Sequence, residues 1–326
     1  MNRSVIPAFL ILIALVLSAG HVFAAAPVEV RMNYSAPVGE YTPVWVAQED
    51  GFLAKYGIKT ELKLMRAPTG VQGLIGKSLD IGNVGPELIE ARLGGADVVY
   101  IGALANRFIH SLYVKPELRS LQDLKGKVVG TTQPGSTPHV AIRILLQKGG
   151  LFVGRDVRVV HFQGGGVTEA FLQGAVDAAV LPPPLTLRAK DAGFREILNM
   201  SLENYPMVLA GIAATRTFIK EHPEVIRSYL QAILEALKAA RSDAKRTKEI
   251  IGKYTQTANA QDLEETYRVL SRVWEKIPFV SAAAVQTALE FSTHPAARTA
   301  KPDSFFDNSF LAELERSGFV EHLYRP

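Results

Sequence analysis

A short segment recurs at a fixed distance in the first two-thirds of this chain, and the repeat limits the folds open to it. The first copy begins LIGKSLD at Leu74, and the second begins LQGAVD at Leu172, 98 positions later (172 − 74). Val30 and Val128, which begin apolar segments, have the same offset. Helix, glycine and strand follow one another in any α/β protein, so chance is the alternative explanation. We interpret the repeat as two similar βα units and not as a solenoid.

Apolar runs alternate with helical patterns through both copies of the repeat. The predicted strands cover 28–35, 58–65, 79–83, 97–104, 109–114, 128–131, 157–162, 178–181, 196–200 and 208–215, and the predicted helices cover 42–49, 69–76, 86–93, 140–147, 167–173 and 185–191. From Pro223 onward the apolar residues recur at helical spacing. This alternation is typical of parallel sheets with helices on both faces. Ligands bind such sheets beyond the carboxyl ends of the strands.

The segment from 124 to 151 carries the strand, turn and helix start that most resemble a ligand-binding loop. Ser136-Thr137-Pro138 offers hydroxyls that can cap free N–H groups, and a proline that the first helical turn tolerates. The start of a helix attracts an anion or a polar group, since its N–H groups lack partners and its dipole is positive there. An ordinary capped turn explains the same residues without a ligand.

The N-terminus has the pattern of a secretory signal peptide over residues 1–24. Arg3 precedes an apolar run from 5 to 17, and Val22-Phe23-Ala24 places small residues at the cleavage positions. The run is short for a membrane span, although a retained anchor helix is the alternative. We therefore expect an exported, periplasmic protein that is cut after Ala24 and has no stable membrane insertion.

Composition excludes several classes of function. The chain has no cysteine, which excludes disulfides, thiolate metal sites and a Cys nucleophile. Its net charge is +4 with no basic run interleaved with aromatic residues, so we expect no nucleic-acid partner. The seven histidines are scattered, and no nucleotide-binding or hydrolase motif is present. We therefore predict no catalytic residues, no metal and no cofactor.

The loops after the predicted strands hold the candidate binding residues. Asn83 and Gly85 follow a strand and precede a helix, so they are either ligand contacts or simple turn residues. Tyr41 and Trp45 suit a stacking wall, although Trp45 suits the core equally well. We expect Glu87 to be solvated at a helix N-terminus; if it pointed into the cleft, it would favour a cationic or amine-bearing ligand.

Four segments in order, behind a signal peptide, carry a resemblance to a known family. They are PVGEYTPVWVAQEDGFLAKYGI, GLIGKSLDIGNVG, LQDLKGKVVGTTQPGS and LQGAVDAAVLPPP. Together they resemble ABC transporter substrate-binding proteins of the nitrate/sulfonate/taurine type, which are related to thiamine-pyrimidine-precursor binding proteins. The resemblance runs from about Val28 into the C-terminal helices.

This resemblance implies a type II periplasmic-binding-protein fold, in which two α/β lobes with a hinge enclose a ligand cleft. Lobe one would hold residues 25–116 and 212–326, and lobe two 117–211, with crossings near 114–118 and 208–213. The ligand contacts would fall on Ser35, Tyr41, Asn83, Gly85, Ser136, Thr137, Gly165 and Pro182.

The implied function is an extracytoplasmic receptor that delivers a small solute to an ABC permease. The solute would be a sulfonate-, nitrate- or taurine-like anion or a small aromatic or pyrimidine compound. The loops hold no arginine that marks an anion site except Arg66, so the ligand stays open. The alternatives are a superfamily enzyme acting on a pyrimidine-like molecule, and a ligand-sensing adaptor for a signalling receptor.

Overall fold

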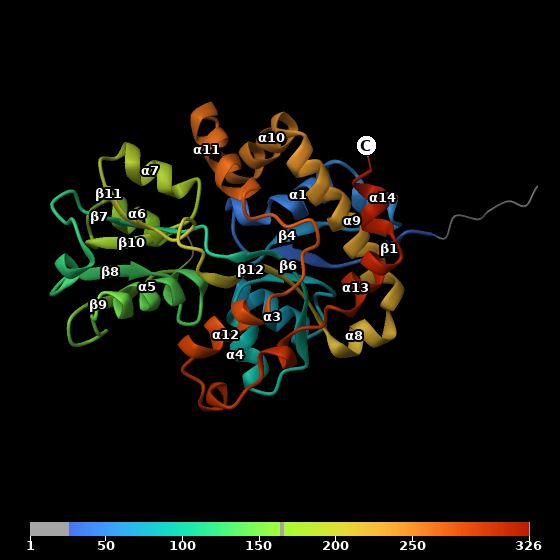
Figure 1. Ribbon diagram of the computed structural model, residues 1–326, viewed down its shortest axis with the longest axis horizontal. Helices are drawn as coiled ribbons and strands as arrows, with labels where there is room; N and C mark the ends of the chain where they lie inside the picture. The colour runs from blue at the N-terminus through green and yellow to red at the C-terminus, as the bar shows by residue number, and fades with distance from the viewer. Residues whose placement is uncertain (1–25, 164–165, 326) are drawn as a thin grey trace, which may run out of the picture.

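The computed structural model describes residues 26–163 and 166–325, which form two lobes of unequal size (Figure 1). The predicted signal peptide at residues 1–24 lies outside the described residues. Among the helices that the structure describes, none is long and apolar enough to cross a membrane. The strands are β1 (Val28–Glu29), β2 (Met32–Tyr34), β3 (Ile58–Lys59), β4 (Leu62–Leu64), β5 (Gly82–Val84), β6 (Val98–Arg107), β7 (Ser111–Val114), β8 (Val128–Thr131), β9 (Arg158–His161), β10 (Ala178–Leu181), β11 (Arg195–Asn199) and β12 (Pro206–Thr215).

Helices cover these strands, and most lie within a few residues of their predicted positions. They are η1 (Gly39–Tyr41), α1 (Thr42–Glu49), α2 (Phe52–Lys55), α3 (Ala67–Ile75), α4 (Glu87–Leu93), η2 (Leu121–Leu124), α5 (Thr137–Lys148), α6 (Gly166–Leu172), α7 (Leu185–Asp191), α8 (Arg216–Glu221), α9 (Pro223–Ser242), α10 (Ala244–Thr255), α11 (Ala260–Ser271), α12 (Ala282–Phe291), η3 (Pro295–Arg298), η4 (Pro302–Phe305), α13 (Ser309–Arg316) and α14 (Phe319–Leu323). Proline occupies the first turn of α1, α3, α5 and α9, where its missing N–H group is tolerated.

The two lobes have sheets of the same strand order. In the smaller lobe, β9, β8 and β10 run parallel, and β10 continues through antiparallel pairs to β7 and β11. In the larger lobe, β4 pairs parallel with β2, and a parallel bridge from Met32 to Ile81 leads on to β5. Antiparallel pairs then join β5 to β12 and β12 to β6. In each lobe the first strand of the unit is flanked by the second and third.

This shared topology confirms that the repeat is structural. Helix α4 and helix α7 begin 98 positions apart, at Glu87 and Leu185, and each follows the third strand of its unit. The residue before each helix is a proline, Pro86 in one copy and Pro184 in the other. The loops at the carboxyl ends of corresponding strands therefore occupy corresponding places in the two lobes.

The chain passes between the lobes earlier than the sequence predicted. Strand β7 is fully buried and pairs with β10 on one side and β11 on the other, so it belongs to the smaller lobe. The first crossing therefore falls at residues 108–110, not at 114–118, and the predicted boundary at 116–117 lies inside that lobe. The second predicted crossing, 208–213, falls within β12, which pairs with β5 and β6 in the larger lobe.

The C-terminal helices belong to the larger lobe (Figure 1). Helix α9 is 20 residues long and packs against α1 and α2, with eleven of its residues buried. Helices α10 and α11 extend this layer toward the smaller lobe, while α12 packs on β12 and also contacts α5 of the smaller lobe.

Candidate functional site

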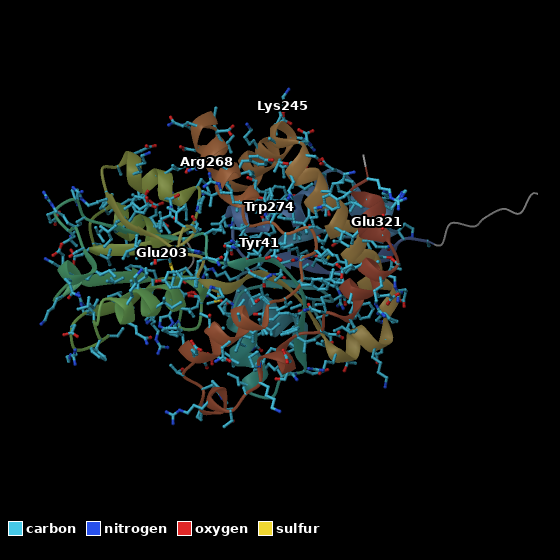
Figure 2. All side chains as sticks on the ribbon, in the orientation of Figure 1. Tyr41, Glu203, Lys245, Arg268, Trp274 and Glu321 are labelled. Carbon is cyan, nitrogen blue, oxygen red and sulfur yellow. The ribbon has the colours of Figure 1, made fainter. Side chains whose placement is uncertain are left out.

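The predicted ligand residues gather where the two lobes meet. Ser35 and Tyr41 lie after β2 of the larger lobe, Asn83 lies within β5 and Gly85 follows it, while Ser136, Thr137 and Pro182 lie after β8 and β10 of the smaller lobe. All seven are buried. Tyr41 lies near the centre of the molecule, between the lobes (Figure 2). Gly165, the eighth predicted residue, lies outside the described residues.

Gly85 and Thr137 come together across the lobe boundary. A methyl group added at Gly85 would lie 3.3 Å from Thr137 Oγ1 and 2.7 Å from Glu87 Oε2. The backbone of the larger lobe thus approaches the start of α5 so closely that only a glycine fits without displacing a neighbour.

Three polar contacts also join the two lobes. The Gly39 N–H donates to the Pro183 carbonyl at 3.4 Å, and the Arg66 guanidinium donates to Gln163 Oε1 at 3.0 Å. The Arg143 guanidinium of α5 donates to the Phe291 carbonyl at the end of α12. Arg66 was the one arginine considered for an anion site, and here its exposed side chain bonds a neutral amide.

Asn83 has a structural role that its sequence context did not reveal. Its side-chain amide donates to the Asn33 carbonyl at 2.7 Å, and its backbone N–H donates to Asn33 Oδ1 at 3.1 Å. The Tyr229 hydroxyl of α9 donates to Asn83 Oδ1 at 3.2 Å, and the Ser35 hydroxyl donates to the Asn83 carbonyl at 2.6 Å. These bonds join β2, β5 and α9, so the Asn83 side chain holds the floor of the site together.

The structure contradicts the predicted capping role of Ser136. Ser136 occupies the N-cap position of α5 with an extended backbone, but its side chain caps no N–H group. Its hydroxyl instead lies 2.5 Å from Thr132 Oγ1 in the preceding loop. Nearby, the Gly135 N–H donates to His139 Nδ1 at 3.1 Å, and burial lowers the pKa of His139 to about 4. His139 is therefore a neutral acceptor that shapes the loop.

The structure also contradicts the expectation that Glu87 is solvated. Its Oε2 atom, at the start of α4, is shielded from solvent and has no hydrogen-bond partner in the described parts of the chain. Glu40 of η1, which the sequence reasoning did not select, has a buried and unpartnered Oε2 atom as well. Glu40 lies in the loop after β2 beside Tyr41, and that position was the available signal.

Burial perturbs the ionisation of this region strongly. Burial, together with the negative charge of Glu87, raises the pKa of the Glu40 carboxyl to about 7. Burial likewise raises the pKa of Glu87 to about 7. For Tyr41, burial and then the Glu40 carboxylate hold the pKa well above its ordinary value. Two acids that share a water-poor site are the kind of perturbed groups that mark functional clefts.

Of the two aromatic residues considered for the site, Trp45 lies in the core and Tyr41 lies closer to the lobe boundary. The Trp45 ring is fully buried and stacks on Tyr254 of α10, with ring centres 4.7 Å apart and planes at 9°. Trp45 is thus a core residue that anchors α1, the second of the two roles considered for it. The Tyr41 ring, 6.5 Å from Trp45, lies closer to the lobe boundary and follows Glu40 directly.

A groove of about 630 Å³ lies between the smaller lobe and the α11 region. Pro183 and Thr186 line it from the smaller lobe, and Asn259, Asp262 and Glu265 line it from the α11 region. Pro183 also accepts the hydrogen bond from Gly39, so the groove and this contact between the lobes share one residue.

This chain is similar to a protein family, to a riboflavin-binding protein and to solved structures. A model of the NMT1-like family matches residues 24–253 of this chain. The riboflavin-binding protein RibY of Chloroflexus aurantiacus is 25% identical over 264 residues, which covers 77% of this chain and 72% of RibY.

Solved structures of the same fold include two bacterial proteins. A protein from Bordetella bronchiseptica RB50 has a TM-score of 0.77 at 18% identity, covering 89% of this chain and 97% of its own. The alkanesulfonate-binding protein SsuA from Xanthomonas axonopodis pv. citri, solved with MOPS, has a TM-score of 0.68 at 20% identity, covering 89% and 98%. These similarities confirm the predicted periplasmic-binding-protein fold.

Proposed function

Since the chain belongs to the NMT1-like family, we propose that it is an extracytoplasmic receptor that binds one small solute between its lobes and delivers it to an ABC permease. The observation that carries this proposal is the buried meeting of strand-end loops from both lobes, with Gly85 against Thr137. A site built equally from two lobes is suited to trap a ligand when the lobes close.

The connections between the lobes support such a movement. The chain crosses at residues 108–110 and again between β11 and β12, so the lobes share two backbone connections. Direct contacts between the lobes include the polar Arg66–Gln163 and Gly39–Pro183 bonds. Few short segments need to change their backbone angles for the lobes to separate. We therefore propose that solute binding favours the closed form and that the permease recognises it.

The compartment follows from the predicted signal peptide, residues 1–24. In this proposal the mature protein starts at Ala25 and works in the periplasm, where an importer meets its solute. The membrane-spanning helices of the importer would then belong to the permease subunits.

Thermal unfolding of the mature chain against a solute panel tests the proposal. The panel includes alkanesulfonates, taurine, nitrate, aromatic carboxylates, aminopyrimidines and, because of the RibY similarity, riboflavin. A solute at about 100 times its dissociation constant should add about 2.7 kcal/mol to the free energy of unfolding. A double change of Ser136→Ala and Thr137→Ala should weaken binding without altering the unfolding temperature of the ligand-free protein by more than a few degrees.

Two results would contradict the proposal. One is turnover of a bound solute into a product, which would indicate an enzyme. The other is the absence of any bound or added solute, judged by native mass spectrometry of gently purified protein together with the panel. Unchanged affinity in the double variant would place the site elsewhere in the molecule.

A further inference from the structure

Glu40 and Glu87, which we call the carboxylate pair, come from two different elements of the larger lobe. Glu40 is in η1, and Glu87 begins α4 with its Oε2 next to Gly85, where the smaller lobe contributes Thr137. The charge of Glu87 acts on Glu40, so the two groups are close enough to interact. Neither Oε2 atom has a hydrogen-bond partner in the residues described, and no cation contributes to the ionisation of either group.

The smaller lobe adds more unpartnered oxygens at the carboxyl end of its sheet. Thr131 ends β8 and Thr168 lies in α6; both are at least nine-tenths buried, and their hydroxyls lack partners within the described chain. The Gln133 Oε1 atom, in the loop that leads to Thr137, is also buried without a partner. An amide oxygen accepts, and hydroxyls accept as well as donate, so these three groups of the smaller lobe are able to accept hydrogen bonds.

An unpartnered carboxyl oxygen inside a protein is destabilising unless something donates to it. A proton shared between Glu40 and Glu87 would satisfy both groups, but each has an Oε2 atom with no partner. An anionic ligand would place a further negative charge beside the pair and leave the acceptors unsatisfied. A ligand with N–H donors would satisfy the same atoms.

We propose that the site between the lobes binds its solute through N–H donors, as carried by a protonated amine or by an amino or amidino group on a small ring, and that it discriminates against sulfonate, nitrate and carboxylate anions. This inference rests on the proposed receptor function and specifies its ligand class. Glu87 and Glu40 receive the donors, and the Tyr41 ring packs beside them. The threonine hydroxyls of the smaller lobe complete the contacts on closure.

Matched pairs of probes with opposite charge test the inference. Benzamidine and benzoate share a planar six-membered ring, and butylamine and butanesulfonate share a four-carbon chain. Calorimetric titration of the mature chain with each probe at millimolar concentrations compares the charges at nearly constant shape. We expect benzamidine to bind at least about tenfold more tightly than benzoate, with the amine and sulfonate ranked in the same order.

Isosteric variants connect the preference to the carboxylate pair. Glu87→Gln and Glu40→Gln should each reduce the affinity for benzamidine about ten- to a hundredfold, because a charge-assisted hydrogen bond becomes a neutral one. Glu221→Gln, on the exposed surface of α8, removes the same charge far from the site and should leave the affinity unchanged. The unfolding temperature of each ligand-free variant shows whether the fold is kept.

The outcomes separate this inference from the receptor proposal. The ligand class would be wrong if benzoate bound more tightly than benzamidine, or butanesulfonate more tightly than butylamine. It would also be wrong if neither Glu→Gln change altered the affinity for benzamidine. In either case the protein would be a receptor with another specificity. If no amine or amidine binds while an anion from the wider panel does, the inference also fails and the receptor stands. If no solute of either charge binds, both proposals fail.

Discussion

At the scale of single residues, two buried polar side chains of the larger lobe differ in their hydrogen bonding. The Asn83 side chain donates to the Asn33 carbonyl and accepts from the Tyr229 hydroxyl, and this pairing makes its burial stable. Glu40 is buried almost as completely but has an unpartnered oxygen. A buried polar group that the protein does not satisfy is a candidate contact for a ligand, whereas one that it does satisfy is part of the scaffold.

The perturbed ionisation of Glu40 predicts a pH dependence of stability. Its pKa is about 7 in the folded chain and near 4.5 when unfolded, so the folded state binds more protons between these values. The free energy of unfolding should therefore fall as the pH rises from 4.5 to 7. Replacing Glu40 with Gln removes this loss, and the variant should gain up to about 3 kcal/mol over the wild type between about pH 5 and about pH 8.

Urea unfolding of both ligand-free proteins at the two pH values measures this difference. His110, which is buried with its pKa lowered to about 3, has the opposite effect on stability, but it is present in both proteins and cancels. Parallel pH profiles for wild type and variant would show that the Glu40 carboxyl is solvated in the folded protein.

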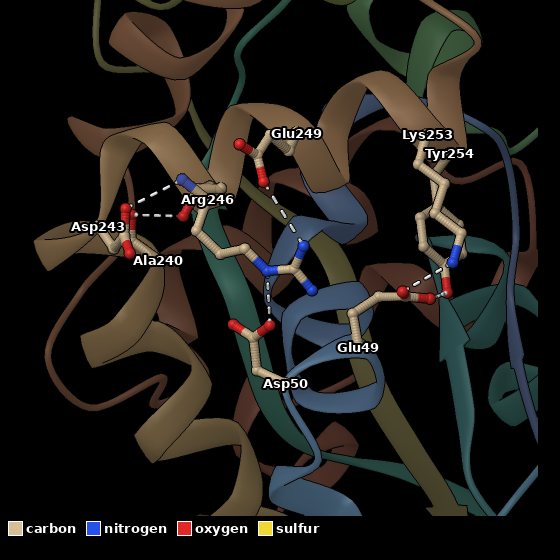
Figure 3. Close-up of polar contacts among 9 residues, drawn as sticks. Glu49, Asp50, Ala240, Asp243, Arg246, Glu249, Lys253 and Tyr254 are labelled. Carbon is tan, nitrogen blue, oxygen red and sulfur yellow. Dashed lines mark hydrogen bonds and ion pairs between the residues drawn. The ribbon is translucent and has the colours of Figure 1, made fainter.

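At the scale of elements, α1 is the helix that presents the η1 loop to the site. Its first turn carries Pro43, and its buried face includes Val44, Trp45 and Val46. Helix α10 fixes its far end: Arg246 donates to Asp50 at 2.9 Å, and Lys253 and the Tyr254 hydroxyl donate to Glu49 at 2.7 and 2.9 Å (Figure 3). The Trp45–Tyr254 stack lies along the same interface. The C-terminal helices therefore position Glu40 and Tyr41 indirectly, through α1.

The apolar and charged parts of this interface should differ greatly in their contributions. Trp45→Ala leaves a large cavity under α1 and should reduce the free energy of unfolding by about 3–5 kcal/mol. Lys253→Ala breaks an ion pair whose lysine is 61% exposed, and it should cost less than about 1 kcal/mol. Urea unfolding of the two variants tests this ranking, and similar losses for both would contradict it.

At the scale of the whole molecule, function depends on how closely the lobes approach. The boundary contains close backbone contacts such as Gly39–Pro183 and side-chain contacts such as Arg66–Gln163 and Arg143–Phe291. We expect it to separate and to close again when a ligand bridges the two sides. The groove beside α11 shares Pro183 with this boundary, so we expect the solute to enter from that side.

The glycine at this boundary gives the third prediction. Gly85→Ala adds a methyl group 2.7 Å from Glu87 Oε2 and 3.3 Å from Thr137 Oγ1, so full closure requires both side chains to move. Affinity for the solute identified by the panel should fall about tenfold or more, mainly through faster release, while the unliganded fold stays intact. Stopped-flow dissociation measures the release. Gly94→Ala, at the exposed end of α4, is the control and should release the solute at the wild-type rate.

The local sequence patterns located most of the strands and the longer helices. Strands β8 and β10 and helix α7 have their predicted bounds, because their apolar patterns are strong and glycine or proline lies near their ends. The predicted position of the first crossing between the lobes was wrong. Strand β7 is short and apolar, and its sequence does not indicate which of the two sheets it joins. Only its pairing with β10 and β11 assigns it to the smaller lobe.

Local patterns and spacing predict the two similar βα units, their parallel strands and the loops that would meet. The surroundings of the side chains in those loops depend on the tertiary structure. It turned the Ser136 hydroxyl toward Thr132, bonded Asn83 to Asn33, and shielded the Oε2 atoms of Glu40 and Glu87 from solvent without partners. Burial and hydrogen bonding depend on residues far apart in the chain, such as Asn83 and Tyr229, and no local pattern specifies such contacts.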